Sequence, residues 1–423
     1  MRVRTHIAVD IFFLLSVTII WFMVGYQLIL FMFGHLYYRR TREGSEAPPP
    51  LPDEDCPGVS ILIPCHNEER VIAHTIRALL ELDYPIGQIE IVVIDDGSTD
   101  RTGEIARTFD SVARVQVVVV PPEKSARGKS SALNYGIQFA RHSLVAIYDA
   151  DNVPEPGALR PLVSQLITHP KLGATLGMYR AWNRRRSLIT RFVNIESIAF
   201  QWILQAGRWM LLHVTTLPGT NYVIRRELVQ KLGGWDEQAL TEDAELSIRI
   251  YQAGYQIQFV PSSVTWEQEP ERLAHWFRQR RRWVRGSNYV FRKFAGSLLK
   301  TRPKRIGFEL LYSLSLYYVF FLAVLISDVM LILLATGVVQ LSMAGPYGII
   351  WIVAFVTFVL QLTIALGCEP GEDTLTNILL ACIMYFTYAQ LWIPLVAAGF
   401  YDDFVVGRER KWDKTKRYEM NTP

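Results

Sequence analysis

The chain has 423 residues, enough for about two or three domains. Half of the residues are hydrophobic, and the formal net charge of +4 is too small an excess for a general nucleic-acid-binding protein. The four cysteines form no C-x-x-C pair, which argues against a structural zinc site and against a disulfide framework. We therefore expect the soluble part of the chain to lie in a reducing compartment.

The chain begins with an apolar segment. Residues 11–38 contain no Asp, Glu, Lys or Arg, and the segment is long enough to span a bilayer. It continues directly into basic residues without a small-residue cleavage site, so we expect a signal anchor over residues 1–40 rather than a cleaved signal peptide. A proline-rich, acidic linker follows over residues 41–57.

From residue 58 the pattern changes to alternating strands and helices. Four short, apolar, β-branched runs alternate with helical patterns, and these runs begin near residues 59, 89, 114 and 144. Such alternation predicts a mostly parallel α/β sheet that is covered on both faces. We expect this domain to extend over residues 58–270.

Polar loops follow three of the predicted strands. They are His66-Asn67-Glu68, Asp95-Asp96-Gly97-Ser98 and Asp149-Ala150-Asp151. Open α/β sheets bind ligands at the carboxyl ends of their strands, so these loops predict one site at one edge. Carboxylates there can hold a divalent cation, which suits a phosphate-bearing substrate. An isolated D-x-D is more often a solvated turn, but this one ends a buried strand.

Two further observations narrow the chemistry. Residue 123 is Glu, where a P-loop would need glycine five residues before Gly128, which argues against a P-loop ATPase. The stretch "TEDAEL" predicts a helix start with Thr241 as N-cap and Glu242 and Asp243 in its first turn. Simple helix capping is the alternative to a catalytic base at this point.

Two basic amphipathic segments lie in the second half of this region. Residues 184–213 carry apolar side chains at three- and four-residue spacing with several arginines, and residues 271–305 contain "FRQRRRWVRG". We expect both to be helices that lie in the membrane interface, with an ordinary core-facing helix as the alternative for the first.

The last part of the chain is again apolar. Three blocks, at about 306–339, 347–366 and 375–400, predict a transmembrane region over residues 306–402, before a basic tail over 403–423. Basic flanks favour a cytoplasmic central domain, and they favour a cytoplasmic tail as well. One span before the domain and three after it would place the tail outside. Either one late block lies in the interface or the charge rule fails here.

Four motifs then coincide in order: "DDGS" at 95–98, "DAD" at 149–151, "TED" at 241–243 and Q-x-x-R-W at 279–283. This series resembles the membrane-integrated, processive family-2 glycosyltransferases, which include poly-N-acetylglucosamine, hyaluronan, chitin and cellulose synthases. The resemblance covers about Val59 to Gly286 and the flanking spans. The compact length looks most like the bacterial poly-β-1,6-N-acetylglucosamine synthases.

The resemblance implies a GT-A fold inserted between transmembrane helices. It implies inverting, processive transfer from a UDP-sugar, with UDP-N-acetylglucosamine favoured, to a growing β-linked polysaccharide that is moved across the plasma membrane. The catalytic domain would be cytoplasmic. The implied partners are the UDP-sugar, the polysaccharide and the bilayer, with a small accessory membrane subunit as a further candidate and no nucleic acid.

The resemblance also implies roles for individual residues. Asp243 matches the catalytic base, with Glu242 beside it. The donor-binding positions are Glu68, Asp96, Lys129, Asp149 and Arg282. A Mg²⁺ or Mn²⁺ ion would bind at Asp149 and Asp151, with Asp151 as the direct ligand. The acceptor would meet Gln279 and Trp283 and border Gly219, Thr220 and Asn221, where the sequence "PGTNYVIRR" departs from many relatives.

Other functions stay open at this point. A hyaluronan-, chitin- or cellulose-type synthase would use another UDP-sugar, and a non-processive enzyme would add one sugar to a lipid acceptor. A membrane component that binds a nucleotide-sugar without turnover is the non-enzymatic alternative, against which the complete acidic set argues.

Overall fold

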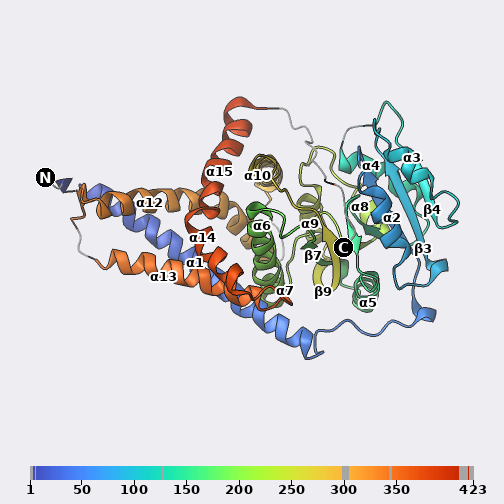
Figure 1. The fold of residues 1–423 in the computed structure, drawn as a ribbon, viewed down its shortest axis with the longest axis horizontal. Coiled ribbons are helices and arrows are strands. Elements are labelled where there is room, and N and C mark those ends of the chain that lie inside the picture. Colours follow the sequence, from blue (N-terminus) through green and yellow to red (C-terminus); the bar gives the residue numbers. More distant parts are fainter. Residues whose placement is uncertain are drawn as a thin grey trace.

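The computed structural model describes residues 3–4, 6–125, 128–297, 304–342, 345–408 and 418. Most of the predicted basic tail therefore lies outside the described residues. Three layers follow one another along the long axis (Figure 1): long helices near the N-terminus, a middle layer of helices, and an α/β domain. The order of these layers places the α/β domain at one end and the apolar helices at the other.

One eight-stranded sheet organises the α/β domain, with the strand order β4-β3-β2-β5-β8-β7-β9-β6. The strands are β2 (Val59–Cys65), β3 (Ile89–Asp95), β4 (Val115–Val119), β5 (Leu144–Ile147), β6 (Val153–Pro154), β7 (Leu172–Ala181), β8 (Tyr222–Arg225) and β9 (Gln256–Glu267). Strands β4, β3, β2 and β5 are parallel, as predicted. Strand β8 runs antiparallel to both β5 and β7, so the other half of the sheet is mixed.

Helices cover this sheet. They are α2 (Ile72–Leu80), α3 (Thr102–Arg107), α4 (Lys129–Gly136), α5 (Leu159–Thr168), α8 (Arg226–Lys231) and α9 (Glu242–Gln252). Every residue of β3 is buried, and so are all but one of β2. Burial on both faces explains why these strands read as continuous apolar runs rather than as alternating ones. The α/β architecture predicted from the sequence is confirmed.

The middle layer contains the two segments that were predicted as interface helices. The first is a continuous helical run of α6 (Leu188–Ala199), a π-helical turn (Phe200–Gln205) and α7 (Ala206–Leu212), and the second is α10 (Leu273–Phe294). The first run packs against three apolar helices, α1 (Ile7–Arg42), α13 (Tyr347–Leu366) and α14 (Leu375–Phe386). Its apolar side chains, such as Phe192 and Trp202, are thus buried by protein, and the core-facing alternative describes this face better.

The N-terminal helix α1 (Ile7–Arg42) is locked to the middle layer by two glycines. A Cβ atom on Gly34 would overlap with the carbonyl group of Trp202, and one on Gly207 would overlap with that of Leu30. The two helices therefore touch backbone to backbone where they cross. The hydroxyl of Tyr37 also donates a hydrogen bond to the carbonyl of Phe259 in β9 (2.6 Å). These contacts fix α1 to the middle layer and to the α/β domain.

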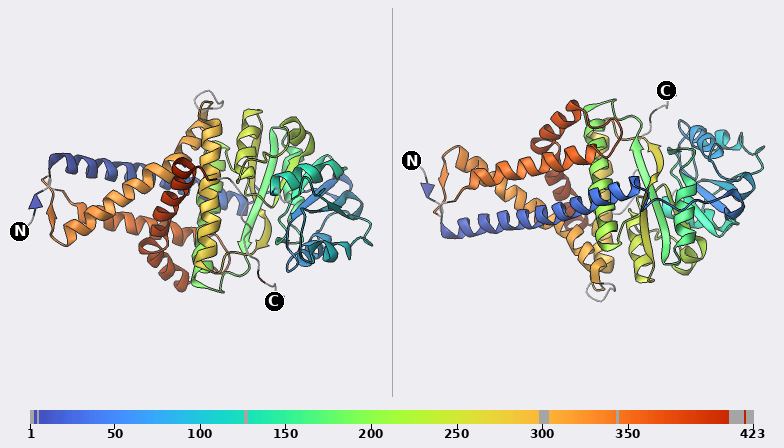
Figure 2. Two further views of the ribbon diagram at one scale, coloured as in Figure 1. Left: turned by 90° about the horizontal axis from the view of Figure 1, so that it is seen from above. Right: turned by 90° about the horizontal axis from the view of Figure 1, so that it is seen from below.

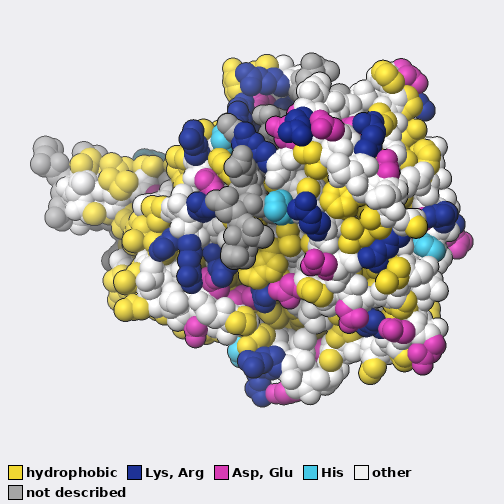
Figure 3. Space-filling view, turned by 45° about the vertical axis from the view of Figure 1, so that its right-hand side comes forward, with side chains coloured by type: hydrophobic (Ala, Val, Ile, Leu, Met, Phe, Trp, Pro, Cys, Tyr) yellow, Lys and Arg dark blue, Asp and Glu magenta, His cyan; other side chains and the backbone are white. Residues whose placement is uncertain are grey.

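The C-terminal part supplies the remaining long helices. They are α11 (Lys304–Ser315), a π-helical turn (Leu316–Phe320), α12 (Phe321–Ala335), α13 (Tyr347–Leu366), α14 (Leu375–Phe386), α15 (Trp392–Phe400) and a second π-helical turn (Tyr401–Val406). In the described part of the chain, four helical stretches are long and apolar enough to cross a membrane: 7–42, 304–335, 347–366 and 375–406. In Figure 3, apolar side chains gather on the projecting end, and Lys and Arg side chains gather between it and the α/β domain.

The fourth apolar stretch has a different direction from the other three. Helices α1, α12 and α13 run along the long axis, whereas α14 and α15 run across it, as the views in Figures 1 and 2 agree. At the projecting end, β1 (Val3–Arg4) pairs with β10 (Val339–Gln340). The loop between α13 and α14 instead contacts the α/β domain, where Glu372 pairs with Arg184 (2.8 Å).

Candidate active site

The carboxyl ends of the neighbouring strands β2, β3 and β5 bring the three predicted polar loops together. The Nδ1 atom of His66 donates to the carbonyl of Asp96 (2.7 Å), and the side-chain oxygen of Asn67 accepts from the backbone N–H of Thr99 (2.7 Å). Asn67 adopts a left-handed conformation (φ 57°) to make this contact. These bonds hold Glu68 and Asp96, which are both largely buried, at the wall of a cavity that opens at this edge of the sheet.

Lys129, at the start of α4, joins the two acidic motifs. Its Nζ atom lies 2.5 Å from Oδ1 of Asp149 and 3.4 Å from Oε1 of Glu242, and it donates to the carbonyl of Gly219 (2.6 Å). Burial disfavours the ammonium ion and lowers the pKa of Lys129. The attraction of the Asp149 and Glu242 carboxylates is stronger than this effect, so the pKa is raised overall. The side chain is therefore a permanent cation between the D-x-D and the T-E-D.

Asp243 lies half-buried in the first turn of α9. Burial, reinforced by the negative charge of Glu242, raises the pKa of Asp243 to about 7, while Lys129 acts in the opposite direction. Thr241 does occupy the N-cap position, but its side chain makes no capping hydrogen bond. The acidic turn is thus more than a helix cap, because it holds a carboxylate whose pKa lies near neutrality.

The segment "GTN" divides into two kinds of residue. Gly219, with φ 88°, lines the cavity, and a Cβ atom there would lie 3.1 Å from Oδ2 of Asp243. Thr220 and Asn221 are not among the cavity-lining residues. Thr220 accepts from the backbone N–H of Asp149 (3.1 Å), and the Asn221 amide donates to the carbonyl of Met178 (3.0 Å). Both side chains are buried by protein and neither lines the cavity, in contrast to the prediction that they border an acceptor.

The D-x-D is supported from behind. Asp151 is almost fully buried, and one of its oxygens, Oδ2, accepts from the backbone N–H of Gln268 (3.3 Å). Both Asp149 and Asp151 line the cavity. Among the described residues, no group of three or more His, Cys, Asp or Glu side chains could hold a metal ion.

Helix α10 brings the Q-x-x-R-W to the same cavity, since Gln279, Arg282 and Trp283 all line it. The approach is close because Gly286 has no side chain: a Cβ atom there would lie 2.5 Å from the Thr241 side chain. The T-E-D and the Q-x-x-R-W thus meet where α9 and α10 cross.

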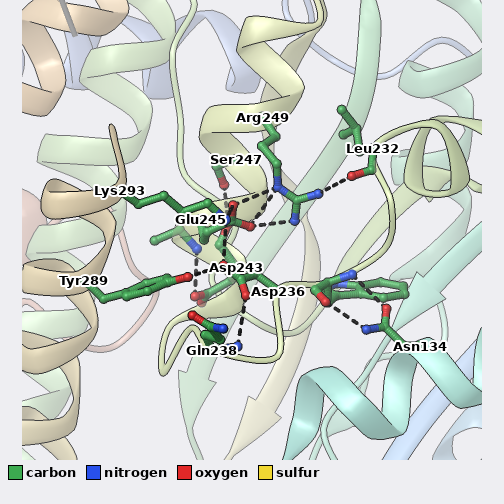
Figure 4. Close-up of polar contacts among 12 residues, drawn as sticks. Asn134, Leu232, Asp236, Gln238, Asp243, Glu245, Ser247, Arg249, Tyr289 and Lys293 are labelled. Atoms are coloured by element: carbon green, nitrogen blue, oxygen red, sulfur yellow. Dashed lines mark hydrogen bonds and ion pairs between the residues drawn. The ribbon is translucent and has the colours of Figure 1, made fainter. Parts of the chain in front are cut away.

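An ion-pair network holds these two helices together (Figure 4). Nζ of Lys293 in α10 lies 2.6 Å from Asp236 and 2.8 Å from Glu245, and Arg249 pairs with the other oxygen of Glu245 (2.5 Å). The hydroxyl of Tyr289 also donates to Asp236 (2.6 Å). Because Glu245 is completely buried and lies two residues after Asp243, this network fixes the position of Asp243 relative to α10.

The other arginines of "FRQRRRWVRG" are largely paired within the protein. Arg280 is buried with Glu196 (2.7 Å), Arg281 pairs with Asp402 (2.5 Å), and Arg285 pairs with Asp403 (2.9 Å). Acidic side chains of the chain itself therefore balance the charges of these three arginines. Arg208 of α7 is likewise buried, and it pairs with Glu309 (2.8 Å).

A single cavity of about 840 Å³ joins all these parts. Of the predicted site residues, all except Thr220 and Asn221 line it. Its wall continues between the apolar helices, where it includes Trp21 of α1, Tyr317, Asp328 of α12, Trp351 of α13 and Tyr385 of α14. The loops at the carboxyl edge of the sheet and the apolar helices therefore line the same cavity.

Sequence reasoning missed several residues of this wall. Glu196, Tyr388 and Glu309 line the cavity, and each makes a polar contact with a segment far away in the chain. The only signal for them was a charged or hydroxyl side chain inside an apolar helical pattern. Such a side chain indicates a buried polar contact, but the sequence does not predict which residue is its partner.

Comparison with known proteins identifies the family. Residues 57–286, just over half of the chain, match the family described as "Glycosyltransferase like family 2". The chain belongs to this glycosyltransferase family. It is therefore an enzyme, and the matched residues run from the first strand of the sheet to the end of the Q-x-x-R-W.

The relatives include enzymes of the predicted subfamily. The glycosyltransferase is 41% identical, over 97% of its own length and 98% of the relative's, to a probable glycosyltransferase of Bacillus subtilis. It is 29% identical to the poly-β-1,6-N-acetyl-D-glucosamine synthase of Staphylococcus epidermidis over 62% of this chain. That alignment spans 63% of the synthase, slightly less than two thirds.

A solved structure supports the fold. The mannosyltransferase of Pyrobaculum calidifontis, which was determined with GDP-mannose and Mn²⁺, superposes with a TM-score of 0.62 at 21% identity. The match covers 92% of this glycosyltransferase and 99% of the mannosyltransferase. At this identity, the similarity speaks for the GT-A fold alone.

Catalysis through Asp243 predicts a specific pH profile. Since the carboxyl group must be ionised to accept a proton, kcat/KM should rise with pH through about 7, the value to which its pKa is raised. The substitution Glu242→Gln removes the neighbouring negative charge and should move this acidic limb to lower pH. Asp243→Asn should abolish transfer while UDP binding persists. An acidic limb that stays in place in Glu242→Gln would contradict the coupling.

Proposed function

We propose that this glycosyltransferase is a processive synthase that elongates a β-linked polysaccharide and moves it across the plasma membrane. UDP-N-acetylglucosamine is the favoured donor because curated relatives are poly-β-1,6-N-acetylglucosamine synthases. The observation that carries the proposal is the single cavity, which is lined both by the acidic motifs and by the membrane helices. A product that leaves through this cavity would enter the membrane region directly.

The donor would bind at the edge of the sheet. Glu68 and Asp96 would contact the uridine end, and Lys129 and Arg282 would contact the diphosphate. All four residues line the cavity. Asp149 and Asp151 would hold Mg²⁺ or Mn²⁺, for which carboxylate oxygens and diphosphate oxygens are suitable ligands. Such an ion, when bound, offsets the charge that develops on the departing UDP.

The transfer itself needs one base. The acceptor hydroxyl is a poor nucleophile at neutral pH, and the carboxylate of Asp243 would take its proton as the new glycosidic bond forms. The bond between the sugar and the diphosphate breaks at the same time, and Lys129 and Arg282 stabilise the charge on UDP. One displacement without a covalent intermediate inverts the configuration of the sugar.

The acceptor would lie against α10. Trp283 is half-buried at the cavity wall and offers an aromatic face to a sugar ring. Gln279, one turn earlier, can exchange hydrogen bonds with sugar hydroxyl groups. Gly219 keeps open the space beside Asp243 into which the reacting hydroxyl must enter.

Incubation of the purified protein with each UDP-sugar in turn tests the function. We expect UDP release and a high-mass, glycosidase-sensitive polymer with one UDP-sugar, and neither in excess chelator. Asp243→Asn is the control for background hydrolysis. A product limited to a lipid-extractable monoglycoside would contradict processive synthesis and favour a lipid acceptor.

We further propose that the chain crosses the membrane three times, with its catalytic domain in the cytoplasm. The loop before α14 is held against the catalytic domain and the middle layer through its residue Glu369. The Glu369 carboxylate pairs with Arg180 (2.9 Å) and accepts a hydrogen bond from the indole of Trp202 (2.8 Å). The end of the same stretch is held on that side by Asp403, which pairs with Arg285. A stretch with both ends on one side does not cross.

This topology also resolves the conflict in the basic residues. The tail residue Tyr418 exchanges two backbone hydrogen bonds with the Gln268 side chain (2.7 and 2.8 Å), so it too lies beside the catalytic domain. Three crossings place both basic flanks and the tail in the cytoplasm, in agreement with the positive-inside rule. The exposed apolar side chains of 375–406, such as Leu375, Leu379 and Phe386, would face the lipid interface.

Labelling of single cysteines by a membrane-impermeant maleimide tests the topology. In intact cells, Ser342→Cys between α12 and α13 should react. Asp373→Cys and Arg408→Cys, at the two ends of the fourth stretch, should react only after permeabilisation. Reaction of Arg408→Cys in intact cells would mean that the fourth stretch spans the membrane.

A further inference from the structure

We propose that Arg280 is a positioning residue for the Q-x-x-R-W, which fixes the acceptor-facing side chains of Gln279 and Trp283. The inference rests on the proposed role of these two residues in acceptor binding. It concerns a residue that the motif itself leaves unspecified.

The contacts of Arg280 point to this role. Its guanidinium carbon lies 3.8 Å from the centre of the Trp283 ring, which is a close stack of a planar cation on an aromatic face. Its Nη1 atom also donates to the side-chain oxygen of Gln279 (3.1 Å). One side chain thus contacts both motif residues that face the acceptor.

The guanidinium is itself rigidly held. Arg280 is 1% exposed, and its Nη2 atom donates to Oε2 of Glu196 in α6 (2.7 Å). The hydroxyl of Tyr388 donates to the same oxygen (2.8 Å) and accepts from the indole of Trp276 (2.7 Å). The residues of this chain of contacts come from α6, α10 and the turn after α14.

This arrangement differs from an ordinary surface cation–π contact. A buried charge that loses its partner is strongly unfavourable, so Arg280 stays with Glu196 and keeps one orientation. The Trp283 ring stacks on this guanidinium, so the orientation of Arg280 also fixes the orientation of the ring. Because Glu196 belongs to the middle layer, the geometry of the acceptor platform depends on the docking of α6 against α10.

The test separates acceptor binding from donor binding. In Arg280→Lys the charge remains, but the planar stack and the forked contact with Glu196 and Gln279 are lost. We expect the KM for a β-1,6-linked N-acetylglucosamine oligosaccharide, and its Kd by calorimetry in the presence of UDP, to rise about tenfold, equivalent to about 1.4 kcal/mol. The KM for UDP-N-acetylglucosamine and the slow hydrolysis of this donor should stay within about twofold.

Two further variants make the result decisive. Arg278→Lys, two residues earlier and exposed, is the matched control and should leave the acceptor KM unchanged. Tyr388→Phe removes a hydroxyl that holds Glu196 without changing any charge, so it should raise the acceptor KM in the same direction even where Arg280→Lys does not fold.

The possible failures are distinguishable. An unchanged acceptor KM in both Arg280→Lys and Tyr388→Phe, or an equal loss of donor binding, would overturn the positioning role. Wild-type protein that binds the oligosaccharide without extending it would contradict the proposed polymerisation, while the Kd values still decide the role of Arg280. Wild-type protein that does not bind the oligosaccharide would contradict both.

Discussion

The partly buried ion pairs of Lys129 are the interaction on which the site depends. Lys129 joins Asp149 of the D-x-D to Glu242 of the T-E-D, two motifs that lie far apart in the sequence. A buried ammonium ion without partners would be unstable by on the order of several kcal/mol, so these carboxylates and this cation must assemble together. The same pairing leaves Asp243 beside one cation and one anion, with a pKa near neutrality.

The second constraint is the contact between the catalytic domain and the apolar helices. Gly34 and Gly207 allow α1 to touch the middle layer, and the Arg281–Asp402 and Arg285–Asp403 pairs tie α10 to the last helical stretch. The helix that carries the Q-x-x-R-W is therefore fixed both to α9 and to the membrane region. Such double attachment suits an enzyme whose product leaves through the membrane.

The sequence predicted the parts of the structure that depend on local pattern. Parallel strands β4, β3, β2 and β5 were recognisable as continuous apolar runs, and acidic loops at their carboxyl ends could be expected to meet. The mixed half of the sheet was not predicted, because β8 joins the sheet only after a long helical insertion. Local propensity does not specify such distant pairing.

The arginines of residues 277–286 also show that local sequence pattern does not reveal distant partners. Five of ten residues from Phe277 to Gly286 are arginine, and a charge run of this kind is typical of a surface patch. Arg280, Arg281 and Arg285 are paired instead with acids 84 to more than 100 residues away, which periodicity cannot reveal. Family resemblance selected Arg282 from this run, but it did not indicate that Arg280 supports the tryptophan.

Synthesis by the protein in proteoliposomes tests most directly whether catalysis is coupled to export. With catalytic domains facing outward, UDP-N-acetylglucosamine would be added outside together with a glycosidase that cleaves the polymer. A product that passes through the cavity enters the lumen, so we expect polymer that resists the glycosidase until detergent is added. Polymer that is degraded at once without detergent would contradict a path from the active site through the membrane.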